Sequence, residues 1–349
     1  MTNLPFEDIL CLVNYAANLI ARRSIMSRYY VAADGGGSKL QAILYDENLR
    51  VIRRGRVAGV NTLFKPVDIV RANVESMVKD LLQGQNGEPP ITEIAAADLC
   101  LVGARDIVGE ALSRFAVVQQ LHFHSEPVVG LAAALKTSGA VALSGTGSDA
   151  FLVRDGKVLS AVGGWGPLLG DEGSGYHIGL NAIKAAIYSH DGRGPKSMLY
   201  DLVMEKWALT KLWDIVTYMA GNPEVRHEVA SAAALCAKAA RAGDRVALGI
   251  YENAALELSL QARTVIESRR EDWNGSIVIM GGAWKGCARM FDVFKREIEL
   301  VYPGATVEKP TFEPVVGCAV LRCLREGLPL SEIQDGLSRG FQEFKYIEI

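Results

Sequence analysis

The sequence is short of paired cysteines and of excess positive charge. Its six cysteines, at positions 11, 100, 236, 287, 318 and 323, form no CxxC pair, and no His/Cys cluster has metal-ligand spacing. This argues against a zinc or iron–sulfur site and favours buried thiols in a reducing cytoplasm, where we expect the protein to be located. With 37 Lys and Arg against 40 Asp and Glu, the net charge of −3 argues against a nucleic-acid partner.

Long hydrophobic runs and two common nucleotide-binding motifs are also absent. The apolar stretch 9–23 is short of a membrane span, and Arg22 and Arg23 follow its apolar run, whereas a signal peptide carries its positive charge in front. We therefore expect no membrane partner. Residues 1–27 are interpreted as an N-terminal extension, either an amphipathic helix or a product of start-site choice, since Met26 immediately precedes the first strand. No GxxxxGKS/T P-loop occurs, and no GxGxxG fingerprint ends the first strand.

A pattern of short strands and glycine-rich turns occurs twice. It begins at Val31 with VAADGGGSKLQAILYDENLRVIRRGRVAG and again at Val141 with VALSGTGSDAFLVRDGKVLSAVGGWG, an offset of 141 − 31 = 110 residues. The first copy continues with a predicted helix at 66–82, a strand at 96–103, a helix at 106–115 and a strand at 117–125; the second resumes with a strand at 275–283. A chance similarity of hairpins is the alternative, but the common offset and the shared βββαβαβα order favour a duplication.

The duplication and the chain length together predict two domains. We place an N-terminal domain at 28–126 and a C-terminal domain at 127–349, with a helical insert at about 174–270. The two glycine turns would then face each other across an interdomain cleft, where ligands commonly bind. Within the insert, the Ala-rich stretch 230–243 fits either a homodimer surface or the core.

The glycine turns have the composition of phosphate cradles. DGGGSK, at 34–39, places Asp34 at the end of the first strand, where its carboxylate suits Mg²⁺ and the following N–H groups suit an anion. SGTGSD, at 144–149, offers the same backbone with the hydroxyls of Thr146 and Ser148. A third turn, IVIMGGAWKG at 277–286, allows a flat ring to lie on its two glycines or, equally, tight helix–strand packing.

Four polar positions lie between these turns. Asn61, in AGVN, could contact a polyol or simply form a turn. Glu126 ends a strand just before a helix opened by Pro127, so its carboxylate could accept a proton from an attacking hydroxyl or cap the helix. His122 and His124 share one strand face, but no third ligand accompanies them, which favours packing or solvent exposure.

These motifs, together with GGWGPLLGDEGSGYHIG at 163–179, resemble in order and spacing those of the N-acetylglucosamine kinases, from Tyr29 to about Leu328. These kinases share the BadF/BadG/BcrA/BcrD-type ATPase family with activator ATPases of CoA-ester reductases and dehydratases, within the superfamily of acetate and sugar kinases, actin and chaperone ATPases. The resemblance implies an α/β fold of duplicated RNase H-like, actin-like ATPase domains. It also implies ATP-dependent phosphorylation of the 6-hydroxyl of an amino sugar, with ATP and Mg²⁺ bound.

The resemblance implies a role for each motif residue. Asp34 would bind Mg²⁺, and Glu126 would be the base for the sugar hydroxyl. The residues expected to bind the nucleotide are Gly35, Gly36, Gly37, Ser38, Lys39, Gly145, Thr146, Gly147, Gly281, Gly282 and Trp284. The residues expected around the sugar are Asn61, Ser148, Asp149, Gly164, Trp165 and Asp171.

Two positions depart from the kinase pattern. Glu126 stands where the family has Asp, and one methylene moves a carboxylate by about 1.5 Å. Asp149 stands where the family usually has Asn beside the sugar. Because of these departures, the sequence does not determine whether the acceptor is N-acetylglucosamine, glucosamine or N-acetylmuramate. They also leave open a non-catalytic sugar sensor. An activator ATPase, whose cysteines share a cluster across a dimer, is a further alternative on the basis of Cys318 and Cys323.

Overall fold

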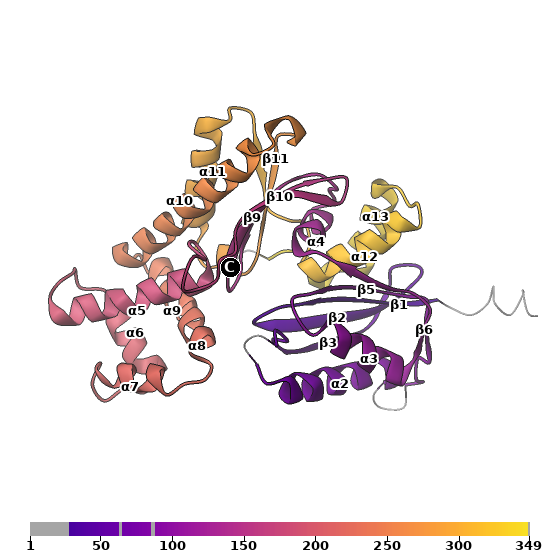
Figure 1. Cartoon of the computed structure of the whole chain (residues 1–349), viewed down its shortest axis with the longest axis horizontal. Coiled ribbons are helices and arrows are strands. Elements are labelled where there is room, and N and C mark those ends of the chain that lie inside the picture. Colours follow the sequence, from indigo (N-terminus) through magenta and orange to yellow (C-terminus); the bar gives the residue numbers. More distant parts are fainter. Residues whose placement is uncertain (1–27, 63–64, 85–87, 348–349) are drawn as a thin grey trace, which may run out of the picture.

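The computed structural model describes residues 28–62, 65–84 and 88–347. The predicted extension at 1–27 lies outside these residues. The described chain forms two halves, each built on a five-stranded sheet, with a group of helices beside the second sheet (Figure 1).

The first half follows the predicted element order. Its elements are β1 (Tyr29–Gly35), β2 (Lys39–Asp46), β3 (Val51–Ala58), α2 (Val67–Gln83), β4 (Glu93–Ile94), β5 (Ala96–Leu101), α3 (Arg105–Phe115), β6 (Val117–Val118) and β7 (Leu121–His124). The stretch 117–125 is two short strands and not the single predicted strand, because β6 pairs with β4 in a separate sheet while β7 joins the main one. In α2, the residues at 70, 74, 77, 78 and 81 are buried, the spacing of one helix face.

The second half carries the helical insert. Its elements are α4 (Glu126–Ala133), β8 (Gly139–Ser144), β9 (Ser148–Arg154), β10 (Lys157–Gly163), α5 (Gly175–Asp191), α6 (Leu199–Lys206), α7 (Asp214–Ala220), α8 (Val225–Ser231), α9 (Ala233–Arg241), α10 (Arg245–Glu267), β11 (Ser276–Met280), α11 (Ala288–Val301), β12 (Thr306–Glu308), α12 (Pro314–Arg325) and α13 (Leu330–Gly340). Short 3₁₀ turns lie at Arg270–Asp272, Ala283–Lys285 and Gln342–Phe344. None of the helices in the described part of the chain combines the length and apolar character that a membrane span needs.

The two main sheets have the same topology, which confirms the duplication. The strand order is β3-β2-β1-β5-β7 in one and β10-β9-β8-β11-β12 in the other. In both, three antiparallel strands are followed by two parallel ones, with β1 and β8 at the centre. The carboxyl ends of the equivalent strands β1 and β8 carry the two glycine turns.

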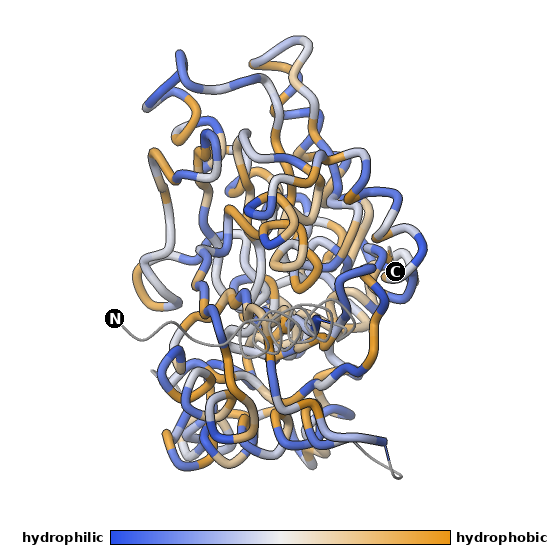
Figure 2. Tube along the Cα trace, turned by 90° about the vertical axis from the view of Figure 1, so that its right-hand side faces the viewer, coloured by the Kyte–Doolittle hydropathy of each residue, from blue (hydrophilic) through white to orange (hydrophobic). Residues whose placement is uncertain are grey.

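Each sheet is covered by helices on both faces. In the first half, α2 and α3 pack on one face. In the second half, helices of the insert and α11 pack on one face, and α4 lies on the other. Hydrophilic stretches mark many of the outer turns (Figure 2). Within the insert, α9 buries Cys236, Ala237 and Ala240, which agrees with the core interpretation of stretch 230–243.

The C-terminal helices α12 and α13 pack against the first half of the chain. Residues of α12 and α13, among them Val316 and Leu337, form one apolar cluster with Tyr30, Ile43 and Tyr45 of the first sheet. The chain therefore returns to its first half at its end, where α12 covers the sheet face left open by α2 and α3 (Figure 1). The physical reason is that this face, rich in aliphatic and aromatic side chains, needs an apolar partner, and the buried faces of α12 and α13 supply one.

Candidate active site

The glycine turns of the two halves meet. The Ser38 and Thr146 hydroxyls are hydrogen-bonded at 2.7 Å, and a Cβ placed on Gly37 would lie 3.5 Å from Oγ1 of Thr146. This contact confirms that the equivalent turns of the repeat face each other. It also places backbone from both halves around one central space.

Glycine is required where neighbouring strands support these turns. A Cβ on Gly59, in AGVN, would lie 2.0 Å from the carbonyl oxygen of Gly37, and the next residue, Val60, donates its N–H to the Gly36 carbonyl at 2.9 Å. Gly281, after β11, has a φ of 108°, and a Cβ there would lie 2.2 Å from the Ser144 carbonyl oxygen. The flanking motifs thus hold the two phosphate-cradle turns in position by close backbone contact.

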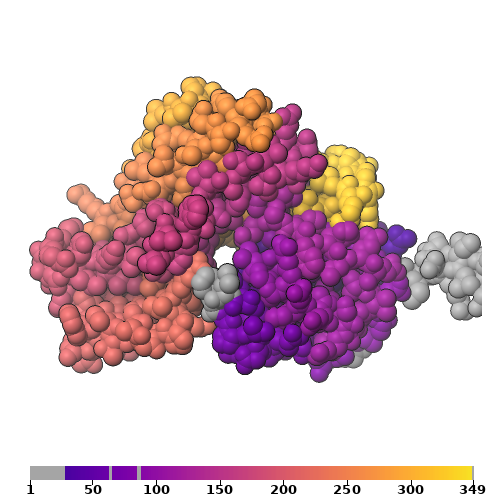
Figure 3. All heavy atoms as spheres, in the orientation of Figure 1, coloured from indigo at the N-terminus to yellow at the C-terminus, as the bar shows by residue number. Residues whose placement is uncertain are grey.

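A cavity of about 580 Å³ lies between the halves and the helical insert. The space-filling view shows the molecule hollowed between the insert and the first half (Figure 3). The cavity is lined by eleven of the residues expected from the sequence: Asp34, Gly35, Gly36, Gly37, Ser38, Lys39, Glu126, Gly145, Thr146, Gly281 and Gly282. Three alanines of α9 (Ala233, Ala234 and Ala237) form an apolar wall of the kind that suits a flat base.

Burial raises the pKa of two carboxyls in this cavity. Glu126, the first residue of α4, has its pKa raised to about 7, mainly by burial and then by the charges of Asp34 and Asp149. Asp34 has its pKa raised to about 6 by burial and by Glu313, against the lowering effect of Lys39 and of a hydrogen bond with Cys100. A carboxylate with a pKa near neutrality is suited to accepting a proton at physiological pH.

The structure bears on whether Glu126 caps the helix and on whether His122 and His124 form a ligand pair. Ser125 occupies the N-cap position of α4, and no side chain caps this helix end by a hydrogen bond. His124 belongs to a structural ion cluster: its Nε2 lies 2.8 Å from Oδ1 of Asp98, which is fully buried and also accepts two hydrogen bonds from Arg325 of α12, at 2.6 and 2.9 Å. His122 contacts Gln120 instead, so the two histidines do not act as a ligand pair.

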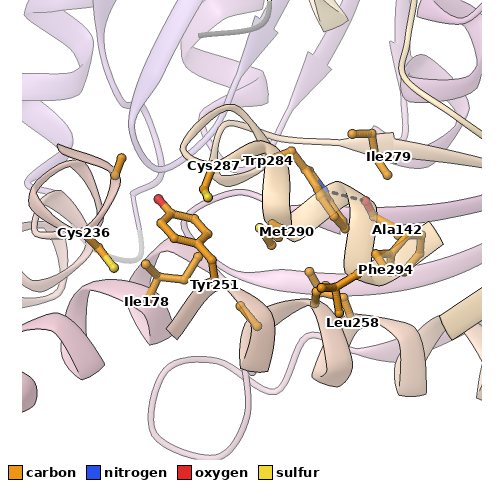
Figure 4. Close-up of a cluster of buried hydrophobic side chains, with 14 of the residues drawn as sticks. Ala142, Ile178, Cys236, Tyr251, Leu258, Ile279, Trp284, Cys287, Met290 and Phe294 are labelled. Atoms are coloured by element: carbon orange, nitrogen blue, oxygen red, sulfur yellow. Dashed lines mark hydrogen bonds between the residues drawn. The ribbon is translucent and has the colours of Figure 1, made fainter. Parts of the chain in front are cut away.

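Trp284 does not lie where the sequence places it. Its side chain is only 4% exposed, its Nε1 donates to the Ala142 carbonyl at 3.2 Å, and its ring packs edge-on against Phe294 (Figure 4). The indole therefore belongs to the core of the second half and does not border the cavity. Gly147 also lies outside the cavity lining, because its Cα faces the carboxylate of Asp171.

Three of the six residues expected around the sugar, Asn61, Ser148 and Asp171, are buried. Ser148 and Asp171 are buried and bonded to the protein: Ser148 Oγ donates to the Glu172 carbonyl at 2.7 Å, while Asp171 accepts from the Ser148 N–H and from Arg226. Asn61 is buried beside the backbone of Gly103. In contrast, Trp165 is 75% exposed.

Asp149 and Gly164 lie next to each other. A Cβ on Gly164 would be 2.5 Å from Oδ1 of Asp149. Burial and the charge of Asp171 raise the pKa of Asp149 to about 6, and Asp149 in turn raises that of Glu126. The carboxylates expected at the acceptor end thus influence one another electrostatically.

Sequence reasoning missed several charged and aromatic residues of the cavity. They are Arg56, His227, Arg241, Tyr251, Lys285, Glu313 and Tyr346. Lys285, within the quoted GGAWKG motif, forms an ion pair with Glu313 and lies over the ring of Tyr346. The alternation along β3 could have identified Arg56; nothing in the local sequence marks Tyr346, which reaches the cavity only because the C-terminus folds back.

Asp34 fits the requirements of a magnesium site that includes a nucleotide. Mg²⁺ is usually bound by one or two carboxylates with water and phosphate oxygens. In the described residues no group of three or more His, Cys, Asp or Glu side chains could hold a metal alone, so phosphate oxygens would have to complete the coordination. The raised pKa of Asp34 marks a buried carboxylate whose charge a cation would stabilise.

The fold and the cavity define a two-domain ATPase built from duplicated halves. The chain belongs to the BadF/BadG/BcrA/BcrD ATPase family, which it matches over residues 33–321. It is 26% identical over 309 residues to the N-acetylmuramic acid/N-acetylglucosamine kinase of Clostridium acetobutylicum, covering 84% of this chain and 98% of that protein. It is 27% identical over 311 residues to the N-acetyl-D-glucosamine kinase of Dictyostelium discoideum, covering 84% and 97%.

A solved structure supports the fold independently. A candidate N-acetylglucosamine kinase from Porphyromonas gingivalis superposes with a TM-score of 0.67 at 16% identity, covering 86% of this chain and all of that one. The predicted fold class, duplicated actin-like ATPase domains with a helical insert in the second, is confirmed.

Proposed function

We propose that the protein is an ATP-dependent kinase that phosphorylates an amino sugar, with the 6-hydroxyl of N-acetylglucosamine as the first acceptor to test. The observation that carries the proposal is the position of Glu126: a carboxyl with a pKa of about 7 lines the same cavity as both glycine turns. The names of the two kinase relatives support the acceptor class. A cytoplasmic location would supply ATP and keep the buried thiols reduced.

The cavity residues divide the work of phosphoryl transfer. The N–H groups of Gly36 and Gly145 already donate to the carbonyls of Lys39 and Gly147, so we assign the phosphates to the backbone of Gly37 and Thr146, which both line the cavity. Asp34 would hold Mg²⁺, which when bound neutralises phosphate charge. Glu126 accepts the proton of the attacking sugar hydroxyl. Positioning and charge stabilisation by the two halves account for most of the catalysis, since phosphoryl transfer needs little covalent assistance from a protein.

The acidic acceptor end bears on the choice among amino sugars. The charge of Asp171 raises the pKa of Asp149, and the charge of Asp149 raises the pKa of Glu126. An added carboxylate on the substrate, as in N-acetylmuramate, would be repelled there, whereas a neutral acetamido group or the ammonium group of glucosamine would not. We therefore rank N-acetylglucosamine and glucosamine above N-acetylmuramate.

The decisive experiment measures ADP release with N-acetylglucosamine, glucosamine, N-acetylmuramate and glucose, alongside calorimetric binding of each sugar. We expect turnover with at least one of the first two and the weakest turnover with N-acetylmuramate. Binding of a sugar without turnover would refute the kinase in favour of a sensor. Turnover highest on N-acetylmuramate would refute the electrostatic ranking alone.

The activator-ATPase alternative has a separate structural objection. Cys318 and Cys323 are buried on α12, and Cys318 Sγ donates to the Ala33 carbonyl at 3.4 Å. Neither thiol lies on a surface where a second subunit could share a cluster with it. Iron in the purified protein, measured by elemental analysis, would reopen this alternative.

A further inference from the structure

Two arginines outside the family motifs, Arg56 and Arg241, line the cavity, and Arg56 is the one on the first sheet. Arg56 lies on β3, the edge strand of the first sheet, and lines the cavity together with the DGGGSK turn. It is an exposed side chain on a strand whose residues alternate between half-buried and exposed. An exposed arginine can serve solubility alone. Whether Arg56 binds a ligand therefore has to be argued from its position in the sheet and from its bonding.

The register of the sheet places Arg56 in line with the proposed metal ligand. Gln41 of β2 is paired with Asp34 on one side and with Arg56 on the other. Directly opposed residues of antiparallel strands project their side chains to the same face. Asp34, Gln41 and Arg56 therefore form one row across three strands, on the face that opens into the cavity.

Arg56 also differs from the other cations of the cavity in its bonding. Lys39 donates to Gln41 at 3.2 Å, Arg241 donates to the Gly286 carbonyl at 3.3 Å, and Lys285 is paired with Glu313. Among the lysines and arginines that line the cavity, and within the residues that the structure describes, Arg56 alone has no hydrogen-bond or ion-pair partner in the protein.

We propose that Arg56 binds the phosphate chain of the nucleotide, as a further residue of the phosphate site. A guanidinium presents paired N–H donors that match two phosphate oxygens, and such charge-assisted hydrogen bonds are among the strongest in proteins. The cavity already holds three carboxyls, at Asp34, Glu126 and Glu313, so a polyphosphate bound there needs a cation that is not neutralised by the protein.

The preceding residue on the same face provides a matched control. Arg54 lies two positions earlier on β3, projects to the same side, and is not part of the cavity lining. It forms an ion pair with Glu343 near the C-terminus. Substituting either arginine removes one positive charge from the same strand face; the two differ in their position relative to the cavity and in the ion pair of Arg54 with Glu343.

The test is calorimetric binding of adenosine, AMP, ADP and the non-hydrolysable triphosphate AMPPNP to the wild-type protein and to Arg56→Gln, Arg56→Lys and Arg54→Gln, without sugar. We expect Arg56→Gln to bind adenosine within twofold of wild type and to lose about tenfold in affinity for at least one phosphorylated ligand. Arg56→Lys should recover part of that loss, and Arg54→Gln should bind all four ligands within twofold.

The proposal is overturned if Arg56→Gln binds AMP, ADP and AMPPNP as tightly as wild type. It is equally overturned if the variant loses adenosine affinity to the same extent, because the defect would then lie in the pocket as a whole. The proposal rests on nucleotide use at this cavity and not on the identity of the sugar. A failed sugar panel with an intact Arg56 effect would therefore refute the proposed acceptor and leave the phosphate contact standing.

Discussion

The pH dependence of turnover tests whether Glu126 is the base. Burial, with the charges of Asp34 and Asp149, raises its pKa from 4.5 to about 7. The protonated form cannot accept the sugar proton, so activity should rise with pH and level off above about pH 8. The sign follows from the role: a base is active only when deprotonated, and a raised pKa moves its acid limb toward neutrality.

The size of the effect follows from the shifted pKa. With a pKa of about 7, roughly half of the Glu126 carboxyls are ionised at pH 7 and about one in a hundred at pH 5, which predicts a fall in kcat/KM for the sugar of about fiftyfold. An unshifted glutamate would remain about three-quarters ionised at pH 5, and the fall would be less than about twofold. The two cases are well separated by an ordinary rate assay.

The assay uses ADP release at saturating ATP and Mg²⁺ between pH 5 and 9, with Glu126→Gln as the companion variant. The variant should lose about 10²–10⁴-fold in kcat and the acid limb together, while its affinity for ADP stays within twofold of wild type. If Glu126→Gln keeps the same acid limb, the titrating group is another residue and the reasoning fails. A flat wild-type profile down to pH 5 would refute it as well.

Three further predictions concern the support of the site. Gly281→Ala should destabilise the protein by about 1–3 kcal/mol in urea unfolding, because φ is 108° and the new Cβ would meet a carbonyl oxygen, whereas Gly282→Ala, in the same cavity wall, should not. Trp284→Phe should lower the free energy of unfolding by about 1–3 kcal/mol with ADP affinity unchanged; a tenfold loss of affinity at full stability would restore its expected role beside adenosine. Arg325→Met should cost about 3–5 kcal/mol at pH 7, since it removes two hydrogen bonds from the buried carboxylate of Asp98 and leaves it with His124. Burial opposes ionisation of Asp98, but its hydrogen bonds lower its pKa below the usual value. Wild-type stability should therefore fall as pH drops below about 4, and the variant, measured by the same unfolding assay, should show less of this fall.

The sequence was most informative where one local pattern determines the structure. Alternating apolar runs and glycine turns predicted both hairpins, and their recurrence predicted the matching sheets. The contact between Ser38 and Thr146 followed from that symmetry. Glycine turns of this kind need no distant partner to be recognised, because their backbone conformation depends on the residues within them.

Long-range packing was not predictable in the same way. The structure buries one face of α12, and amphipathic spacing in a sequence does not say which sheet supplies the partner of such a face. Trp284 lies in a motif whose two glycines favour a bound ring and tight helix–strand packing equally. In the structure its side chain is buried in the core of the second half, which agrees with packing. The same limit applies to Asp171, whose contacts with Ser148 and Arg226 come from segments far apart in the chain.

The return of α12 and α13 to the first sheet has a consequence for how the protein is made. The apolar face around Tyr30 and Tyr45 is synthesised before most of the described chain, whereas the helices that cover it follow all the strands of both sheets. At usual elongation rates of about 5–20 residues per second, that face remains without its covering helices for on the order of ten seconds or more. The two halves, although alike in topology, therefore cannot mature one after the other. We expect nascent chains stalled before residue 314 to expose this face and to require a chaperone, although the apolar clusters at 31–116 and 140–307 can already form in them.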